Sequence, residues 1–215
     1  YDYKSKYLLS LVLRRDGYSK LPKDNRWGTF PGISAGWVLS RENFMESCSN
    51  VLSYAKIRAS YGANGNVSGV LDANGNVVTG LDYYTVQGSY GIMKDKDGKI
   101  VPNYNGKVPL MINDLPNPTM RWEKSYTFET GFDIGFLNNK YILNFTYYNR
   151  RTQDKFAEIT LPSHSGVSSF LSNNGEVQNQ GMELELTANV LRTKDWKFTV
   201  SMNTACLLYT SPSPR

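Results

Sequence analysis

The sequence predicts an all-β protein built from an antiparallel sheet with one apolar face and one polar face. Three observations predict this fold class: apolar and polar residues alternate in seven segments, helical periodicity is nearly absent, and aromatic residues make up 13% of the 215 residues, with 15 Tyr. Alternation with a period of two is typical of a strand whose two faces meet different surroundings. The apolar face would form a core in a soluble sandwich and would contact lipid in a transmembrane barrel.

The clearest of the seven segments form a hairpin between Tyr126 and Asn149. One face of the first arm carries Tyr126, Phe128, Phe132, Ile134 and Phe136, and the other face carries Thr127, Glu129, Gly131, Asp133 and Gly135. The second arm repeats the pattern from Tyr141 to Tyr147, and Leu137–Lys140 forms the turn. A greasy, aromatic face opposite a polar face is the pattern of a membrane β-hairpin.

The remaining strands are expected at 7–13, 33–39, 55–61, 182–190 and 196–202. A short helical turn is expected only within 42–52. No segment reaches the roughly 18 consecutive apolar residues that a membrane-spanning helix needs, so a helical membrane protein is excluded. The strands of a barrel never require such a run, and a barrel therefore remains open.

The charge and the cysteines exclude several classes of function. The net charge of +5 is scattered over both signs and contains no compact basic cluster interleaved with aromatic residues, so we expect no nucleic-acid partner. Cys48 and Cys206 lie far apart and form neither a metal-binding nor a redox spacing. We expect no metal site and no cofactor.

Both ends of the chain are unusual. The first residues already resemble a strand, with no initiator Met and no signal segment, so we expect a piece of a longer protein. From Cys206 to Arg215 the alternation stops, and this segment resembles a translated sequencing-adapter or cloning tail. We therefore expect a partial barrel over residues 1–205 and a non-native tail over 206–215.

The connections between the predicted strands alternate in length. They are expected to be long at 15–26, 62–121 and 152–174, and short at 41–51, 137–140 and 192–195. Bacterial outer-membrane barrels have this asymmetry, with short periplasmic turns and long extracellular loops, whereas a Greek-key sandwich does not. Within the longest connection, Asp72–Gly75 and Asp97-Gly98 are hairpin-turn motifs, which predict small hairpins standing above the sheet.

A series of motifs then resembles the C-terminal barrel of SusC/RagA-type TonB-dependent transporters. The resemblance extends from Tyr1 to Ala205, and its motifs occur in the family's order. They are the segments 14–17, 27–31, 34–37, 57–62, 117–124, 131–136, 147–152 and 174–183, among them Asn117-Pro118-Thr119-Met120-Arg121-Trp122 and Asn174-Gly175-Glu176-Val177-Gln178-Asn179.

The resemblance implies an importer in the bacterial outer membrane that takes up oligosaccharides or peptides. It also implies two protein partners, a SusD-like surface lipoprotein that closes over the barrel and TonB, which would contact a segment upstream of this chain. Barrels of this class have about 22 strands around a plugged lumen, so seven strands form about a third of a wall. The predicted fold is therefore a segment of an antiparallel transmembrane β-barrel with long extracellular loops.

Two groups of side chains are candidates for function. Lys56, Arg58, Glu129, Asp133, Glu183 and Glu185 are expected to face the lumen, because they lie on the polar faces of their strands. Tyr83, Tyr84, Tyr90 and Tyr104 in the longest connection are candidates for stacking on sugar rings or contacting the lipoprotein. Packing of that loop against itself is the alternative for each Tyr.

Aromatic residues near the strand ends, among them Trp122, Trp196 and Tyr141, are expected to form girdles at the two membrane interfaces. The paired acids also raise the possibility of glycosidase chemistry. Lumen polarity explains them better, because acids at i and i+2 follow from any polar strand face and no catalytic signature surrounds them. His164, the only histidine, lies in a Ser-rich loop and is expected to be solvated.

Two rival functions remain: a soluble carbohydrate-binding or adhesive β-sandwich, and a β-rich hydrolase. The two rivals would stay in aqueous buffer, whereas the transporter would fractionate with outer membranes. We expect no enzyme activity.

Overall fold

The computed structural model describes residues 1–67, 86–101, 105, 107–167 and 169–210, and one antiparallel sheet contains most of them. Its strands are β1 (Asp2–Tyr3), β2 (Tyr7–Gly17), β3 (Trp27–Val38), β4 (Leu52–Asn66), β7 (Glu123–Phe136), β8 (Tyr141–Thr160), β9 (Ser169–Arg192) and β10 (Lys197–Thr210). Each strand pairs with the next one in the order β1-β2-β3-β4-β7-β8-β9-β10. The seven predicted strands are all present, and the two-residue β1 is added at the β2 edge.

The register aligns apolar side chains with apolar side chains across the whole sheet. One row runs Tyr7–Trp37–Ile57–Phe132–Phe145–Leu184–Thr204. Within it, the rings of Phe132 and Phe145 stack with their centroids 5.2 Å apart. The face that carries this row is called the apolar face below. Many of its side chains are exposed, including Leu11 and Leu13 at 71% and 75%.

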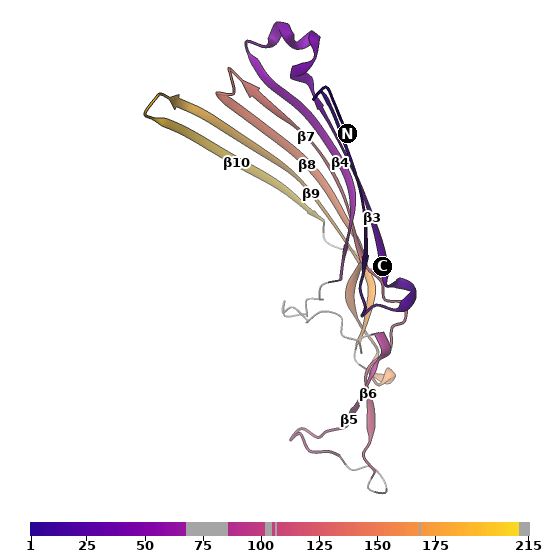
Figure 1. The fold of residues 1–215 in the computed structure, drawn as a ribbon. Coiled ribbons are helices and arrows are strands. Elements are labelled where there is room, and N and C mark those ends of the chain that lie inside the picture. Colours follow the sequence, from indigo (N-terminus) through magenta and orange to yellow (C-terminus); the bar gives the residue numbers. More distant parts are fainter. Residues whose placement is uncertain (68–85, 102–104, 106, 168, 211–215) are drawn as a thin grey trace.

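The opposite face, called the polar face below, is the concave one. Figure 1 shows that the long strands bend together into a curved wall. On the polar side, one hollow is lined both by Arg58 of β4 and by Asn203 and Thr204 of β10, although two of the three strands between them, β7 and β8, contribute Asp133 and Asn144 to the same hollow. A sheet that curls toward its polar side brings such distant strands around one space. Among the described residues, no helix is both long and apolar enough to cross a membrane.

One end of the sheet carries tight turns, drawn at the top of Figure 1. Leu137, Asn138 and Asn139 join β7 to β8, all three with φ between 50° and 59°. Such left-handed backbone favours Asn more than Leu. The β3–β4 connection contains two 3-10 helices, η2 (Leu39–Arg41) and η3 (Asn43–Cys48), in the segment where a helical turn is predicted.

The strict alternation of long and short connections is not observed. The β2–β3 connection, with η1 (Lys23–Asn25), covers only 18–26 and is shorter than the β3–β4 connection at 39–51. The β8–β9 connection, with η5 (Ser163–Ser165), shrinks to 161–168, because β8 and β9 extend far beyond their predicted ends. Only the connection between β4 and β7 is very long. At the other end, β10 continues to Thr210, five residues beyond the predicted boundary at 205.

The long connection contains a small hairpin separate from the main sheet. Strands β5 (Ser89–Ile92) and β6 (Leu110–Asp114) pair antiparallel, and an isolated bridge joins Lys94 to Ile100 around a turn at Asp95–Gly98. This hairpin confirms the prediction made from Asp97-Gly98. The second predicted turn, Asp72–Gly75, lies outside the described residues. The hairpin lies at the opposite end of the molecule from the tight turns (Figure 1).

Tightly packed apolar side chains form one small cluster, near the end of the sheet opposite the tight turns. It consists of Leu21, Phe30, Met120, Trp122 and Phe156, and Met120 is fully buried. Trp122 is only 7% exposed and meets the ring of Phe30 edge-on at 5.5 Å. The predicted role of Trp122 as an interface girdle residue is therefore wrong, because its ring packs inside the protein.

Candidate functional site

The six polar residues predicted to share a face do lie on the polar face. Lys56, Asp133, Asn144, Glu185 and Asn203 occupy one row across β4, β7, β8, β9 and β10. The next row contains Arg58, Gly131, Thr146, Glu183 and Ala205, and the row after it contains Ser60, Glu129, Tyr148, Gly181 and Leu207. Basic, acidic and amide side chains therefore form a mixed patch over five strands.

Arg58 is the central side chain of this patch. Its Nε donates to Asp133 Oδ1 at 3.4 Å, and a terminal guanidinium nitrogen donates to Thr146 Oγ1 at 2.6 Å. Thr146 lies two strands away, and Arg58 can reach it because the intervening position is Gly131. A β-carbon at 131 would collide with the backbone carbonyl of Phe145, so only Gly fits there. The sequence positions two charges and a hydroxyl group by leaving one side chain out.

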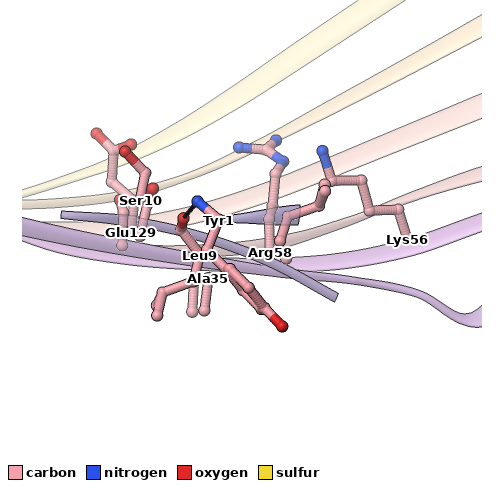
Figure 2. Close-up of a pocket in the computed structure, with 12 residues that line it drawn as sticks. Tyr1, Leu9, Ser10, Ala35, Lys56, Arg58 and Glu129 are labelled. Atoms are coloured by element: carbon pink, nitrogen blue, oxygen red, sulfur yellow. Dashed lines mark hydrogen bonds between the residues drawn. The ribbon is translucent and has the colours of Figure 1, made fainter. Parts of the chain in front are cut away.

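Figure 2 shows the polar face from the edge of the sheet, around a hollow of about 330 Å³ beside β2 and β3. Ser10, Lys56, Arg58 and Glu129 project to one side of the strands, whereas Leu9 and Ala35 point to the other side. Two larger hollows, of about 830 and 640 Å³, lie farther along the same face. The polar face is thus a continuous, water-accessible wall.

The acidic residues are not arranged for catalysis. Glu183 and Glu185 are exposed, and Asn144 Nδ2 donates to Glu185 Oε2 at 3.4 Å. No group of three His, Cys, Asp or Glu side chains within the part of the chain that the structure describes is placed to hold a metal ion. The arrangement offers hydrogen-bond donors and acceptors along a wall.

Of the four loop tyrosines, the structure places only one. Tyr90 lies on β5 opposite Ile112, and its side chain is 74% exposed. Tyr83, Tyr84 and Tyr104 lie outside the described residues. His164 lies in η5 and is exposed.

Sequence reasoning missed several residues of the polar face, among them Thr146, Tyr148 and Arg150 of β8. They alternate with Tyr147 and Asn149, so the period of two already contained the signal. A second omission is the segment Asn117–Trp122, called the clasp below, whose side chains are anchored by hydrogen bonds.

The clasp joins four parts of the chain. The buried Asn117 donates through Nδ2 to the Leu171 carbonyl at 2.8 Å and accepts from Thr119 N at 3.1 Å. Trp122 Nε1 donates to the Arg26 carbonyl at 3.1 Å. Arg121 donates to Asp154 Oδ1 at 2.6 Å, and this carboxylate raises the pKa of the Arg121 guanidinium. The clasp therefore connects the β2–β3 connection to β8 and β9.

Glu42 is the corresponding anchor at the end with tight turns. Its carboxylate accepts hydrogen bonds from the Tyr7 hydroxyl at 2.8 Å and from Trp37 Nε1 at 3.1 Å, and Lys6 Nζ lies at 3.2 Å. These donors, led by Tyr7 and Trp37, hold the pKa of Glu42 below its usual value. They fix the β3–β4 connection against β2.

Comparisons with known proteins match this geometry. The family model described as TonB dependent receptor-like, beta-barrel, matches residues 1–212. TonB-dependent receptor P3 of Formosa agariphila is 32% identical over 203 residues, which are 94% of this chain and 18% of that protein. TonB-dependent receptor SusC of Bacteroides thetaiotaomicron is 32% identical over 204 residues, 94% of this chain and 19% of that protein.

Solved structures show the same fold. The structure of the RagAB peptide transporter matches with a TM-score of 0.76 at 24% identity, over 95% of this chain and 20% of that one. The siderophore receptor PirA from Pseudomonas aeruginosa matches with a TM-score of 0.52 at 15% identity, over 95% of this chain and 32% of that one. The chain thus spans about a fifth of the length of the curated relatives it matches. The chain belongs to the TonB-dependent receptor β-barrel family and forms part of the wall of an outer-membrane barrel.

Proposed function

We propose that the protein containing this chain imports oligosaccharides or peptides across the bacterial outer membrane. The observation that carries the proposal is the two-faced curved sheet, with an apolar convex face and a wet, polar concave face, in a chain of this family. In a closed barrel the apolar face contacts lipid and the polar face lines the lumen. Lys56, Arg58, Glu129, Asp133, Glu183 and Glu185 are then lumenal.

The two cargo classes come from two relatives. SusC shares 32% identity with the chain, and the printed title of the RagAB structure names a peptide transporter. These relatives are receptors and transporters rather than enzymes, so we propose that the acidic residues line a conduit. We also propose a SusD-like surface lipoprotein at the end that carries β5 and β6, and TonB at the opposite side of the membrane. The division at residue 205 likewise stays a proposal.

The test uses the full-length protein in its own bacterium. The protein should fractionate with outer membranes and require detergent for extraction, and its deletion should abolish growth on an oligosaccharide or peptide source that the parent strain uses. A protein that remains in aqueous buffer after the membranes are removed would contradict the proposal and favour the soluble β-sandwich.

A further inference from the structure

Tyr148 is an aromatic side chain within an otherwise polar part of the concave wall. It lies on β8 between Glu129 of β7 and Gly181 of β9. A β-carbon at Gly181 would lie 2.6 Å from both Cζ and Oη of Tyr148. The ring therefore lies over the bare backbone of β9, and it is half-buried there. The wall itself holds this ring in position.

Polar groups surround the ring. Tyr148 lines the hollow of about 640 Å³ together with Glu129, Thr146, Arg150, Asn179 and Glu183. Arg150 uses Nε for Thr127 Oγ1 at 3.3 Å, which leaves its terminal nitrogens available. The carboxylates of Glu129 and Glu183 accept no hydrogen bond from any residue that the structure describes. Acceptors and donors thus stand around a fixed aromatic ring.

We propose that Tyr148 is the stacking platform of a carbohydrate subsite on the wall of the conduit, which takes one pyranose ring of a passing oligosaccharide. A pyranose presents an apolar C–H face and a rim of hydroxyl groups. The C–H face packs on the Tyr148 ring, where an amphipathic aromatic side chain buries area at little entropic cost. The hydroxyl groups donate to Glu129 and Glu183 and accept from Arg150 and Asn179.

The same geometry disfavours a peptide at this position. A bound peptide needs partners for its own backbone N–H and C=O groups. Strand β8 is paired with β7 on one side and with β9 on the other, so it has no free edge beside Tyr148. The inference rests on the proposed import function and narrows it to carbohydrate at this subsite.

The test measures binding to the purified full-length protein in detergent. The probes are oligosaccharides of about six sugar units prepared from starch, xylan, mannan and fructan, and a tryptic digest of casein. Four variants are compared: Tyr148→Leu, Tyr148→Phe, Gly181→Ala and Tyr147→Leu. The last is the matched control, because Tyr147 is the adjacent tyrosine on the apolar face. Heat-dependent migration in detergent gels verifies that each variant is a folded barrel.

The expected result is that one oligosaccharide binds, that Tyr148→Leu weakens it about tenfold, and that Tyr148→Phe weakens it less because the ring remains. Gly181→Ala should weaken it as well, because the new methyl group displaces the ring. Tyr147→Leu should leave binding unchanged. Oligosaccharide binding that is equal in Tyr148→Leu and the parent overturns the subsite and leaves the import function standing. Weakened binding of peptides alone overturns the carbohydrate assignment, and failure of every probe to bind the parent protein overturns both proposals.

Discussion

Replacement of Phe132 by Arg should strongly destabilise the barrel in lipid. Phe132 lies on the apolar face of β7, midway between Phe128 and Phe136, which places it near the middle of the apolar band. An arginine on the lipid face costs about 2 to 4 kcal/mol at the bilayer midplane. Loss of the stacked pair with Phe145, at 5.2 Å, adds about 0.5 to 1.5 kcal/mol.

The matched control introduces the same residue on the other face. Asn144 lies on the polar face between Asp133 and Glu185, so an arginine there meets water and two carboxylates. Asn144→Arg should change the free energy of unfolding by less than about 0.5 kcal/mol. The assay is guanidinium unfolding of the full-length protein in lipid vesicles, followed by tryptophan fluorescence. An equal loss of stability in the two variants would refute the assignment of the faces.

Three further predictions follow from the turns and the wall. Stability contributed by Glu42 should be fully present above its ordinary pKa and should disappear as the pH falls through its lowered pKa, so unfolding curves of the parent and Glu42→Gln should differ at pH 7 and converge in acid; a constant difference would argue against this role. In a background with Cys48 and Cys206 replaced by Ser, a cysteine at Lys96 should react with an impermeant thiol reagent on intact cells, and one at Asn138 only after the outer membrane is opened; external labelling of Asn138 would reverse the topology. Gly131→Ala should destabilise the barrel by about 1 to 3 kcal/mol, because its methyl group meets the Phe145 carbonyl, whereas Gly62→Ala, whose nearest neighbour is 3.6 Å away, should be tolerated in the same unfolding assay.

The sequence predicts the strands well where their two faces meet different surroundings. All seven long strands are found, and the Tyr126–Asn149 hairpin has the predicted turn. The ends of β8 and β9 are missed because the segment from Asn149 to Lys155 is polar at every position. Alternation records contact with an apolar layer, and a strand with both faces in water has no such contact. The same effect makes two connections seem longer than they are.

The candidate site is less predictable because it depends on what lies two strands away. The polarity of Arg58 and Asp133 is visible in their own strands, whereas the contact from Arg58 to Thr146 requires the register of three strands and the absence of a side chain at Gly131. Trp122 illustrates the opposite error. Its place before a strand suggests an interface residue, but its burial depends on Phe30, which is distant in sequence.

The clasp has a consequence for how loops of this barrel can vary. It lies directly before β7, while Val67 and Val86 of the same long connection pack against the neighbouring buried cluster. Both ends of that connection are thus tied to one fixed point, in addition to the pairing of β4 with β7. Closing a flexible loop costs only about 0.6 kcal/mol more for each doubling of its length. Insertions between residues 67 and 117 can therefore be exchanged between relatives at little thermodynamic cost, while the wall beneath keeps its register.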